Sequence, residues 1–459
     1  MKALSVLFFT MFLSSILWAQ DIRHEVVKRD STSGFFESGH FHFHSRTYLM
    51  GTYNRDELSD YGAWAAGAGL GYVSPEWKHF SFGFSGFFIF KLWEHNLNTK
   101  DPLTGGTNRY EVALFDMEDP ENSTDLDRLE ELFIKYRRGS WSFIAGRQHI
   151  ETPFLNGQDN RMRPNIFSGL WTEWEVENVK WEAGWLNSVS PRGTVDWFGL
   201  EESLGVYSFG KNVDGSASQY KGNSRTAGVF ILGGHYERPS WKFHTYHYYT
   251  ENIFHLSYGD ALYKYKRGKE SEWFIGTQWL YQQQVQEGGQ PDPQKSYIQE
   301  GEYTWGSGAT IGSRQGRHRL SYNMLYLHDS GRFVFPREWG REKFWASLPR
   351  ERFEGAGGLF AQSIKWEGEW LGESLHSMVG SGWVIRPDPQ DAALNKYGQP
   401  SFYHIVAQVD YDFSFPLAGL KFSGLLVYKG NAEGQPIPDL IALNRVDLWH
   451  YSVIIDYLF

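Results

Sequence analysis

The last eleven residues of the chain, WHYSVIIDYLF at positions 449–459, carry an apolar or aromatic side chain at every odd position. The even positions include His450, Ser452 and Asp456. Successive side chains of a β-strand point to opposite faces of the sheet. This stretch therefore predicts a strand with one apolar face and one mixed face, and the apolar face must be covered by a second sheet or by lipid.

The same alternation recurs along the chain, for example over 41–49, 172–176, 179–185 and 319–324. In a soluble sandwich the polar face points to water and the apolar face fills a core. In a large membrane barrel the order is inverted, because polar residues face the lumen and apolar residues face lipid. Local alternation does not distinguish these two folds, so the connections between the strands must do so.

The alternation predicts eighteen strands. Their expected ranges are 39–51, 62–73, 77–91, 128–137, 141–147, 168–176, 180–189, 225–236, 241–250, 259–267, 272–283, 301–313, 317–328, 354–366, 373–386, 401–413, 417–428 and 447–459.

The connections between these ranges alternate in length. Short turns such as 74–76 and 138–140 alternate with long loops such as 92–127 and 329–353. An even number of strands, with short turns on one side and long loops on the other, is typical of outer-membrane barrels. The prediction is an all-β fold: a transmembrane antiparallel β-barrel of 18 strands with short periplasmic turns, long extracellular loops and inward-folded constriction loops.

The composition fits such an inside-out protein. The 459 residues include no cysteine, which excludes thiol enzymes and disulfide scaffolds, and the net charge of −10 argues against a nucleic-acid partner. Aromatic residues make up 17% of the chain although the mean hydropathy is −0.48. In a large barrel, aromatic residues coat the outside while polar residues line the lumen and the loops.

Residues 1–19 have the pattern of a cleaved secretory signal peptide, with Lys2, an apolar run and Ala19 at the expected cut. The alternative is an uncleaved anchor, but the run is shorter than the ~20 residues that a spanning helix needs. We expect a single barrel domain over 20–459 in the outer membrane of a Gram-negative bacterium. The expected partners are outer-membrane lipid and lipopolysaccharide, small solutes, and the barrel-assembly machinery, which would bind the strand ending in Phe459.

The loop 148–167 is the most informative connection. Apolar residues are spread through it, as expected if it folds into the barrel, and Arg161 and Arg163 lie near Asp159. An arginine fork suits a carboxylate, so these residues are candidates for guiding an anionic solute. Alternatively, the two arginines only tie the loop to the acidic wall that carries Glu173 and Glu175. Both roles can coexist.

Several motifs resemble the OprD-type outer-membrane porins. They are GRQ at 146–148, TPFL at 152–155 and QDNRMRP at 158–164 for the third loop, PRGT at 191–194 for the fourth, and REWGRE at 337–342 with LPRER at 348–352 for the seventh. The resemblance implies an eighteen-stranded channel in which loops three and seven narrow the pore. It also implies a ladder of basic residues that guides small carboxylate-bearing solutes.

The resemblance supplies candidate residues for solute passage. The constriction set is Arg147, Asp159, Arg161 and Arg163, and the seventh-loop set is Arg337, Arg341, Arg350 and Arg352. Arg46 matches the basic residue of the first strand, and alternation directs it, Lys135 and Arg319 into the lumen. No catalytic residue, metal site or cofactor is expected.

The expected function is that of an outer-membrane porin, not an enzyme, giving passive, substrate-selective diffusion of small hydrophilic solutes such as amino acids, short peptides and organic acids. The alternative is a secreted soluble β protein that binds or cleaves glycans with its tryptophans and carboxylates. The acidic residues of loop 92–127 leave three roles open: placement at the outer mouth, binding of divalent cations, or simple solvation of the loop.

Overall fold

The computed structural model describes residues 38–207, 210–268 and 270–459. Eighteen long strands in this part of the chain form one antiparallel barrel, which closes because β1 pairs with both β2 and β19. The strands are β1 (His40–Tyr53), β2 (Tyr61–Val73), β3 (Phe80–His95), β4 (Asp127–Arg138), β5 (Trp141–Gln148), β6 (Ile166–Val176), β7 (Val179–Ser190), β9 (Val229–Glu237), β10 (Trp241–Thr250), β11 (Phe254–Arg267), β12 (Ser271–Gln284), β13 (Tyr303–Gln315), β14 (His318–Leu327), β15 (Leu359–Trp370), β16 (Leu375–Ile385), β17 (Phe402–Asp412), β18 (Leu420–Asn431) and β19 (Leu448–Leu458).

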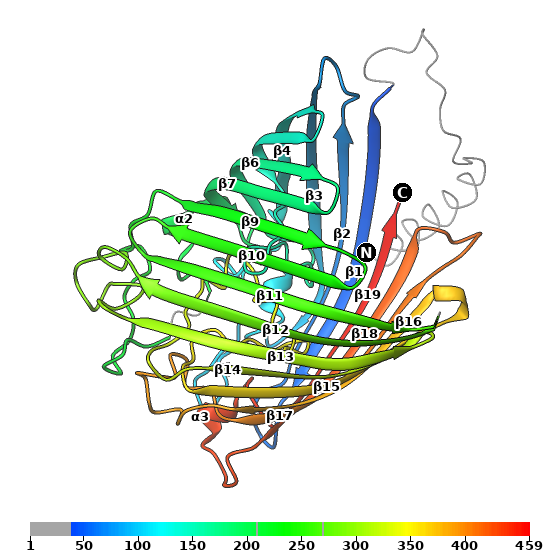
Figure 1. Cartoon of the computed structure of the whole chain (residues 1–459). Helices are drawn as coiled ribbons and strands as arrows, with labels where there is room; N and C mark the ends of the chain where they lie inside the picture. The colour runs from blue at the N-terminus through cyan, green and yellow to red at the C-terminus, as the bar shows by residue number, and fades with distance from the viewer. Residues whose placement is uncertain (1–37, 208–209, 269) are drawn as a thin grey trace.

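The prediction of a closed barrel of 18 strands is confirmed, and neighbouring strands follow one another around the wall (Figure 1). A further two-residue strand, β8 (Phe198–Gly199), pairs only with the end of β7. Three strands begin four or five residues from their predicted positions. β15 begins at Leu359 where 354 was predicted, because residues 354–358 belong to loop 7. β11 begins at Phe254, because the buried alternation of Phe254 with Leu256 extends it toward the loops. β9 begins at Val229. The preceding loop ends at Gly228, which has a φ of 149°, a backbone conformation that favours glycine.

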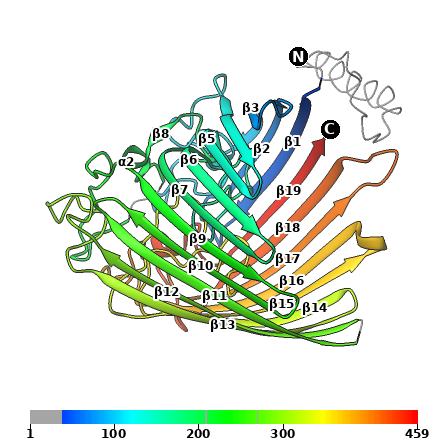
Figure 2. The ribbon, with the colours of Figure 1, turned by 45° about the horizontal axis from the view of Figure 1, so that its top comes forward.

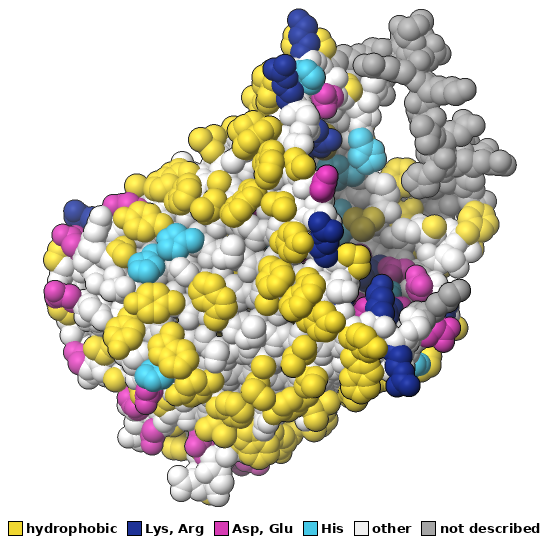
Figure 3. Space-filling model, in the orientation of Figure 1, with side chains coloured by type: hydrophobic (Ala, Val, Ile, Leu, Met, Phe, Trp, Pro, Cys, Tyr) yellow, Lys and Arg dark blue, Asp and Glu magenta, His cyan; other side chains and the backbone are white. Residues whose placement is uncertain are grey.

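The outer face of the barrel is apolar. Large side chains that point outward are about half exposed, including Phe88, Leu170, Ile275 and Ile311, and Figure 3 shows hydrophobic side chains spread across the strands. Tryptophans lie at the strand ends, as expected for interfacial girdles: Trp77, Trp93, Trp141, Trp241, Trp273 and Trp449 are exposed. Trp171 differs from this expectation, because it is buried and its indole N–H donates to Glu173 at 3.3 Å.

The packed core lies inside the barrel, in its long-loop half, where loops fold between the walls (Figure 2). The short elements η1 (Val112–Leu114), α2 (Leu200–Ser203) and α3 (Asp439–Ala442) belong to these loops, whereas η2 (Leu371–Glu373) lies in a short turn. The middle of the acidic loop is part of this filling, since Val112, Leu114 and Phe115 are buried. Simple solvation therefore does not describe this loop as a whole.

Strand direction places the short turns at one end and the long loops at the other. The start of β1 and the end of β19 meet at the short-turn end, where His44 pairs with Leu458. In the described part of the chain, no helix has the length and apolar character needed to cross a bilayer. The predicted signal peptide, residues 1–19, lies outside the described residues.

Candidate pore constriction

Loop 3 (residues 149–165) is held inside the barrel by an aromatic cluster. The Phe154 side chain is fully buried and its ring lies 5.4–5.9 Å from the rings of Tyr248, Tyr258, Phe333, Phe335 and Phe344. Tyr248 and Tyr258 belong to the wall, whereas the three phenylalanines belong to loop 7 (residues 328–358). One ring thus fastens loop 3 to both the barrel and the neighbouring loop.

Backbone contacts fix the two loops more closely. The Asn156 side chain donates to the carbonyl of Arg341 at 2.8 Å, and its backbone N–H donates to the carbonyl of Trp339 at 3.1 Å. Gly340, between them, has a φ of 151°, and a Cβ there would lie 2.3 Å from the carbonyl oxygen of Phe154. Only glycine allows this approach.

Arg46 anchors the tip of loop 3 to the strand wall. Its Nε donates to Asp456 at 2.6 Å, and its Nη1 contacts Asp159 and donates to the carbonyl of Arg161 at 2.7 Å. Asp456 lies directly opposite Arg46 in the register of β1 and β19. Two carboxylates therefore neutralise the Arg46 charge, and the residue serves as a tether as well as lining the lumen.

Two cavities of the lumen adjoin loops 3 and 7 from opposite ends of the barrel, and a third, of about 640 Å³, lies between the two loops beside Glu151 and Lys343. The turn-side chamber, of about 680 Å³, is lined by residues including His44, Arg46 and Asp410, and the loop-side chamber, of about 120 Å³, is lined by residues including Tyr110 and Arg192. Asn160, Arg341 and Arg350 line both chambers. These three residues therefore mark the constriction.

The two chambers differ in charge. The loop-side chamber is lined by eight cationic side chains, Arg109, Arg161, Arg192, Arg337, Arg341, Arg350, Arg352 and Lys429, and by one carboxylate, Glu351. The turn-side chamber is lined by four cations and five carboxylates. A solute that moves from the loops to the turns thus passes from a strongly positive chamber into a nearly balanced one.

Only two of the eight cations have a carboxylate partner among the described residues. Arg337 pairs with Glu354 at 2.6 Å, and Arg352 lies 3.9 Å from Glu342. Burial would lower the pKa of Arg337, but Tyr397 and Glu354 outweigh burial and raise it. Each of these two arginines therefore has a carboxylate close by that offsets its positive charge.

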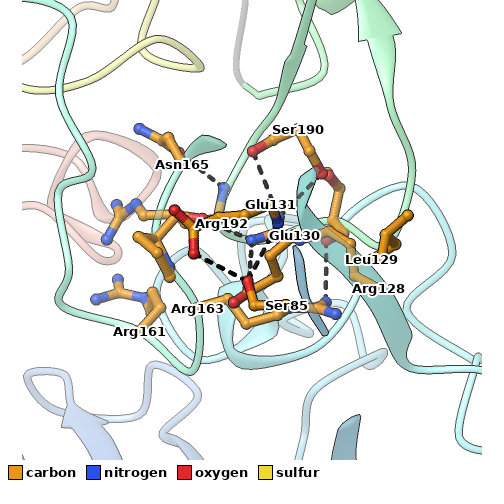
Figure 4. Close-up of polar contacts among 12 residues, drawn as sticks. Ser85, Arg128, Leu129, Glu130, Glu131, Arg161, Arg163, Asn165, Ser190 and Arg192 are labelled. Atoms are coloured by element: carbon orange, nitrogen blue, oxygen red, sulfur yellow. Dashed lines mark hydrogen bonds and ion pairs between the residues drawn. The ribbon is translucent and has the colours of Figure 1, made fainter. Parts of the chain in front are cut away.

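The remaining cations are held by neutral acceptors. Arg161 donates to the Asn160 carbonyl at 2.7 Å, and Arg192 contacts the Asn160 side chain. Arg350 donates to the Tyr48 hydroxyl at 2.8 Å. Figure 4 shows the guanidinium groups of Arg161 and Arg192 on the same side of the view. Arg161 and Arg192, two cations of the loop-side chamber, thus share Asn160, a constriction residue, as their acceptor.

These arginines remain charged at neutral pH. Burial, together with the charge of Arg350, lowers the pKa of Arg161 to about 10. Burial also lowers the pKa of Arg341 and, with the charge of Arg161, that of Arg192. Arginine ordinarily has a pKa above 12, so the lowered values reflect first the burial of these guanidinium groups and second the charges of neighbouring arginines.

The other residues predicted for solute passage lie away from the constriction. The Arg163 side chain is fully buried and donates to the carbonyls of Leu126 at 3.2 Å and Thr194 at 3.0 Å. Burial and Arg128 lower its pKa to about 9, and it supports loop 3 from behind without lining either chamber. The structure therefore places Arg163 in a tie between loop 3 and two neighbouring loops, and its hydrogen bonds do not go to the wall that carries Glu173 and Glu175.

Arg147 requires a correction, because it lies on the outer face of β5. Its register partner Leu132 is 52% exposed among the lipid-facing residues, and opposed residues of an antiparallel pair share a face. The Arg147 guanidinium stacks 4.3 Å from the ring centre of Trp197. The alternation that runs through Trp141 and Phe143 continues through this residue, so it does not line the pore.

Lys135 and Arg319 face the lumen near the short-turn end. Their sequence neighbours Ile134 and Leu320 are 59% and 50% exposed on the outer face. Arg319 is paired with Glu367 at 3.1 Å. Both side chains are far along their strands from loops 3 and 7, so they do not contribute to the constriction.

Three cations of the loop-side chamber were missed by sequence reasoning: Arg109, Arg192 and Lys429. Arg192 lies in the PRGT motif of the fourth loop, which was a usable signal. Lys429 continues the alternation of β18 beyond its predicted end. Arg109 lies in the acidic loop and has no local signal that would direct it inward.

The family model for OprD, outer membrane porin, OprD family, matches residues 33–294. This span is more than half of the chain. The chain belongs to the OprD family of outer-membrane porins. The matched span of this porin includes loop 3, whereas the seventh-loop motif lies beyond it. A search of curated proteins finds no match.

Solved porin structures share the fold at low sequence identity. The crystal structure of Pseudomonas aeruginosa OpdK with vanillate has a TM-score of 0.70 and 15% identity, covering 93% of this chain and 100% of that chain. Pseudomonas aeruginosa OccD3 (OpdP) has a TM-score of 0.68 and 14% identity, covering 93% and 92%. Acinetobacter baumannii OccAB3 has a TM-score of 0.70 and 13% identity, covering 92% and 99%. These likenesses show a shared barrel fold, and the family match shows that the chain is an outer-membrane porin.

Proposed function

We propose that this channel carries small hydrophilic anions, and in particular solutes bearing a carboxylate, such as organic acids, amino acids and short peptides. The observation that carries the proposal is the loop-side chamber, in which eight cations and one carboxylate line the cavity that shares Asn160, Arg341 and Arg350 with the turn-side chamber. Rings of arginine and lysine at a constriction favour anions. Transport is passive, because a barrel of this size encloses a water-filled channel.

The similarity to OpdK supports the choice of solute. That protein was solved with vanillate, a carboxylate. The loop-side chamber of this chain also offers Tyr110, Tyr207 and Phe402 beside its cations, so an apolar body attached to a carboxylate has surfaces to contact. A channel of this kind needs no catalytic residue, and the fold and family indicate a channel, not an enzyme.

The direct test is a planar bilayer measurement under a salt gradient, followed by uptake into liposomes. We expect the sign of the zero-current potential to show anion preference, and we expect carboxylates to enter faster than neutral sugars of similar size. The variant Arg192→Gln is expected to reduce both preferences. Cation preference in the intact protein, or equal uptake of carboxylates and sugars, would overturn the proposal.

We also propose that residues 1–19 direct export and are removed, leaving residues 20–459 as one barrel domain in the outer membrane. Lipopolysaccharide would contact the loop-end girdle, and the barrel-assembly machinery would bind the strand that ends at Phe459. Mass spectrometry of the protein isolated from outer membranes tests the first point: a mature chain beginning at Gln20 supports it, and an intact Met1 contradicts it.

A further inference from the structure

Six cations of the loop-side chamber form a group with no carboxylate partner among the described residues. They are Arg109, Arg161, Arg192, Arg341, Arg350 and Lys429. They come from five parts of the chain: the loop between β3 and β4, loop 3, the loop that follows β7, loop 7 and strand β18. Like charges so close together repel one another unless an anion lies among them.

Some hydrogen-bond donors of these six side chains have no acceptor among the described residues. The Nε–H groups of Arg161, Arg192, Arg341 and Arg350 are buried and donate to no described residue. The Arg161 and Arg192 side chains are only 3% and 8% exposed. The Nε–H groups of Arg163 and Arg386, outside the chamber, share this feature, so it reflects the packing of the arginines. The charge of the six cations, which no carboxylate offsets, is what favours an anionic ligand.

The arrangement favours a ligand with more oxygens and more charge than one carboxylate. A carboxylate is a planar group with a single negative charge and is matched by one arginine fork. A phosphate group carries a charge of about −1.5 to −2 at pH 7 and presents three strong acceptor oxygens when esterified. Donors that approach from five parts of the chain can reach oxygens that point in several directions, and they balance more than one negative charge.

We propose that the loop-side chamber binds a dianionic phosphate group in preference to a carboxylate, so that phosphate-bearing solutes are the tightest-binding substrates of the channel. The inference rests on the proposed function, because it requires an anion-attracting pore. Arg161 and Arg192, which share Asn160 as an acceptor, bind the group together with Arg341 and Arg350 at the constriction, and Arg109 and Lys429 supply the other two charges that line the chamber.

The test compares four probes at pH 8 on the full-length protein in planar bilayers. Phenyl phosphate is a tetrahedral dianion, phenyl sulfate is a tetrahedral monoanion of the same size, benzoate is the planar carboxylate, and inorganic phosphate lacks the organic body. The measured quantity is the concentration of each probe that halves the chloride current. We expect a value at least tenfold lower for phenyl phosphate than for phenyl sulfate or benzoate.

Inorganic phosphate separates the two sources of the group. If inorganic phosphate halves the chloride current at the same concentration as phenyl phosphate, the phosphate group alone accounts for binding, and free phosphate is a ligand. Half-block by the ester alone assigns the site to organic phosphates. Both results support the proposal, since both show preference for the dianionic group.

Paired variants locate the site. Arg192→Gln is expected to reduce the advantage of phenyl phosphate over benzoate at least threefold. Arg238→Gln, in the short turn before β10, changes an arginine far from the chamber and is expected to leave the advantage unchanged. Equal half-blocking concentrations for phenyl phosphate and benzoate in an anion-selective channel would overturn this inference alone. Absence of anion preference in the intact protein would overturn the proposed function as well.

Discussion

The aromatic anchor of loop 3 gives the sharpest mechanical prediction. Phe154→Ala removes a fully buried ring that contacts five other aromatic rings on the wall and on loop 7. Truncation of a buried phenylalanine to alanine typically costs about 3–5 kcal/mol. Because Phe154 joins loop 3 to its surroundings while the barrel wall keeps its own hydrogen bonds, we expect most of this loss to fall on the docking of the loop.

The magnitude translates into a change in loop opening. Each 1.4 kcal/mol changes an equilibrium constant about tenfold, so a loss of about 3–5 kcal/mol raises the undocked population about a hundredfold to a few thousandfold. Hydrogen exchange of peptides covering 149–165 measures this population directly. We expect faster exchange there in Phe154→Ala and, in bilayers, larger and noisier single-channel currents with a weaker anion preference.

A matched control removes the same side chain from the lipid face. Phe143 lies on β5 and is 45% exposed. Phe143→Ala is therefore expected to leave exchange in loop 3 and the single-channel current unchanged. Unaltered exchange over 149–165 in Phe154→Ala would refute the assignment of this ring as the anchor of the constriction loop.

Three further predictions concern the charges around the constriction. Asp159→Asn removes a carboxylate beside Arg46, and a unit charge about 4–8 Å from the pore path is worth roughly 0.5–1 kcal/mol in water. We therefore expect the anion-to-cation permeability ratio from zero-current potentials to rise about two- to fivefold, and an unchanged or lower ratio would contradict the placement of Asp159. Arg163→Met removes the guanidinium hydrogen bonds to the carbonyls of Leu126 and Thr194, so limited proteolysis should cut loop 3 faster, whereas permeability should change less than in Arg192→Gln. A larger permeability change in Arg163→Met would place that guanidinium in the pore. Burial would raise the pKa of Asp101, but hydrogen bonds from Ser59 and Thr104 outweigh burial and lower it to about 2. Since the folded pKa is lower than the unfolded value of about 3.8, this stabilisation is present above pH 4 and is lost as the pH falls toward 2. Hydrogen exchange over 54–60 and 96–106 should therefore lose protection across that interval in the native protein, and Asp101→Asn should show no such step.

The fold could be predicted because its signal is local. A period of two sets the face of each residue, and the alternation of short and long connections sets the ends of the barrel. Arg46 illustrates this success: its parity directs it into the lumen, and the register places Asp456 opposite it. Arg147 follows the same rule, but its side chain lies on the outer face. It shares its parity with Trp141 and Phe143, which lie on the outer face, whereas the motif resemblance assigned it to the constriction.

The candidate site could be predicted only in part, because loop contacts join segments that are distant in the sequence. Arg192 meets Asn160, and Asn156 meets the backbone of Arg341, across separations that alternation does not describe. The QDNRMRP motif gives two arginines at alternate positions of one loop. Arg161 lines the chamber and Arg163 supports the loop from behind, and only the surroundings of each guanidinium distinguish these roles.

The selectivity of the channel depends on unpaired charge, not on the number of basic residues. The chain has a net charge of −10, yet its constriction is positive. Arg46, Arg319 and Arg337 each have a carboxylate partner, so they contribute little net field to a passing solute. The cations held by neutral acceptors such as Asn160 and Tyr48 keep their full charge in a narrow chamber with protein walls, where fields are focused. A mutation that supplies or removes a partner at this point is therefore expected to change permeability more than one that changes the total charge elsewhere.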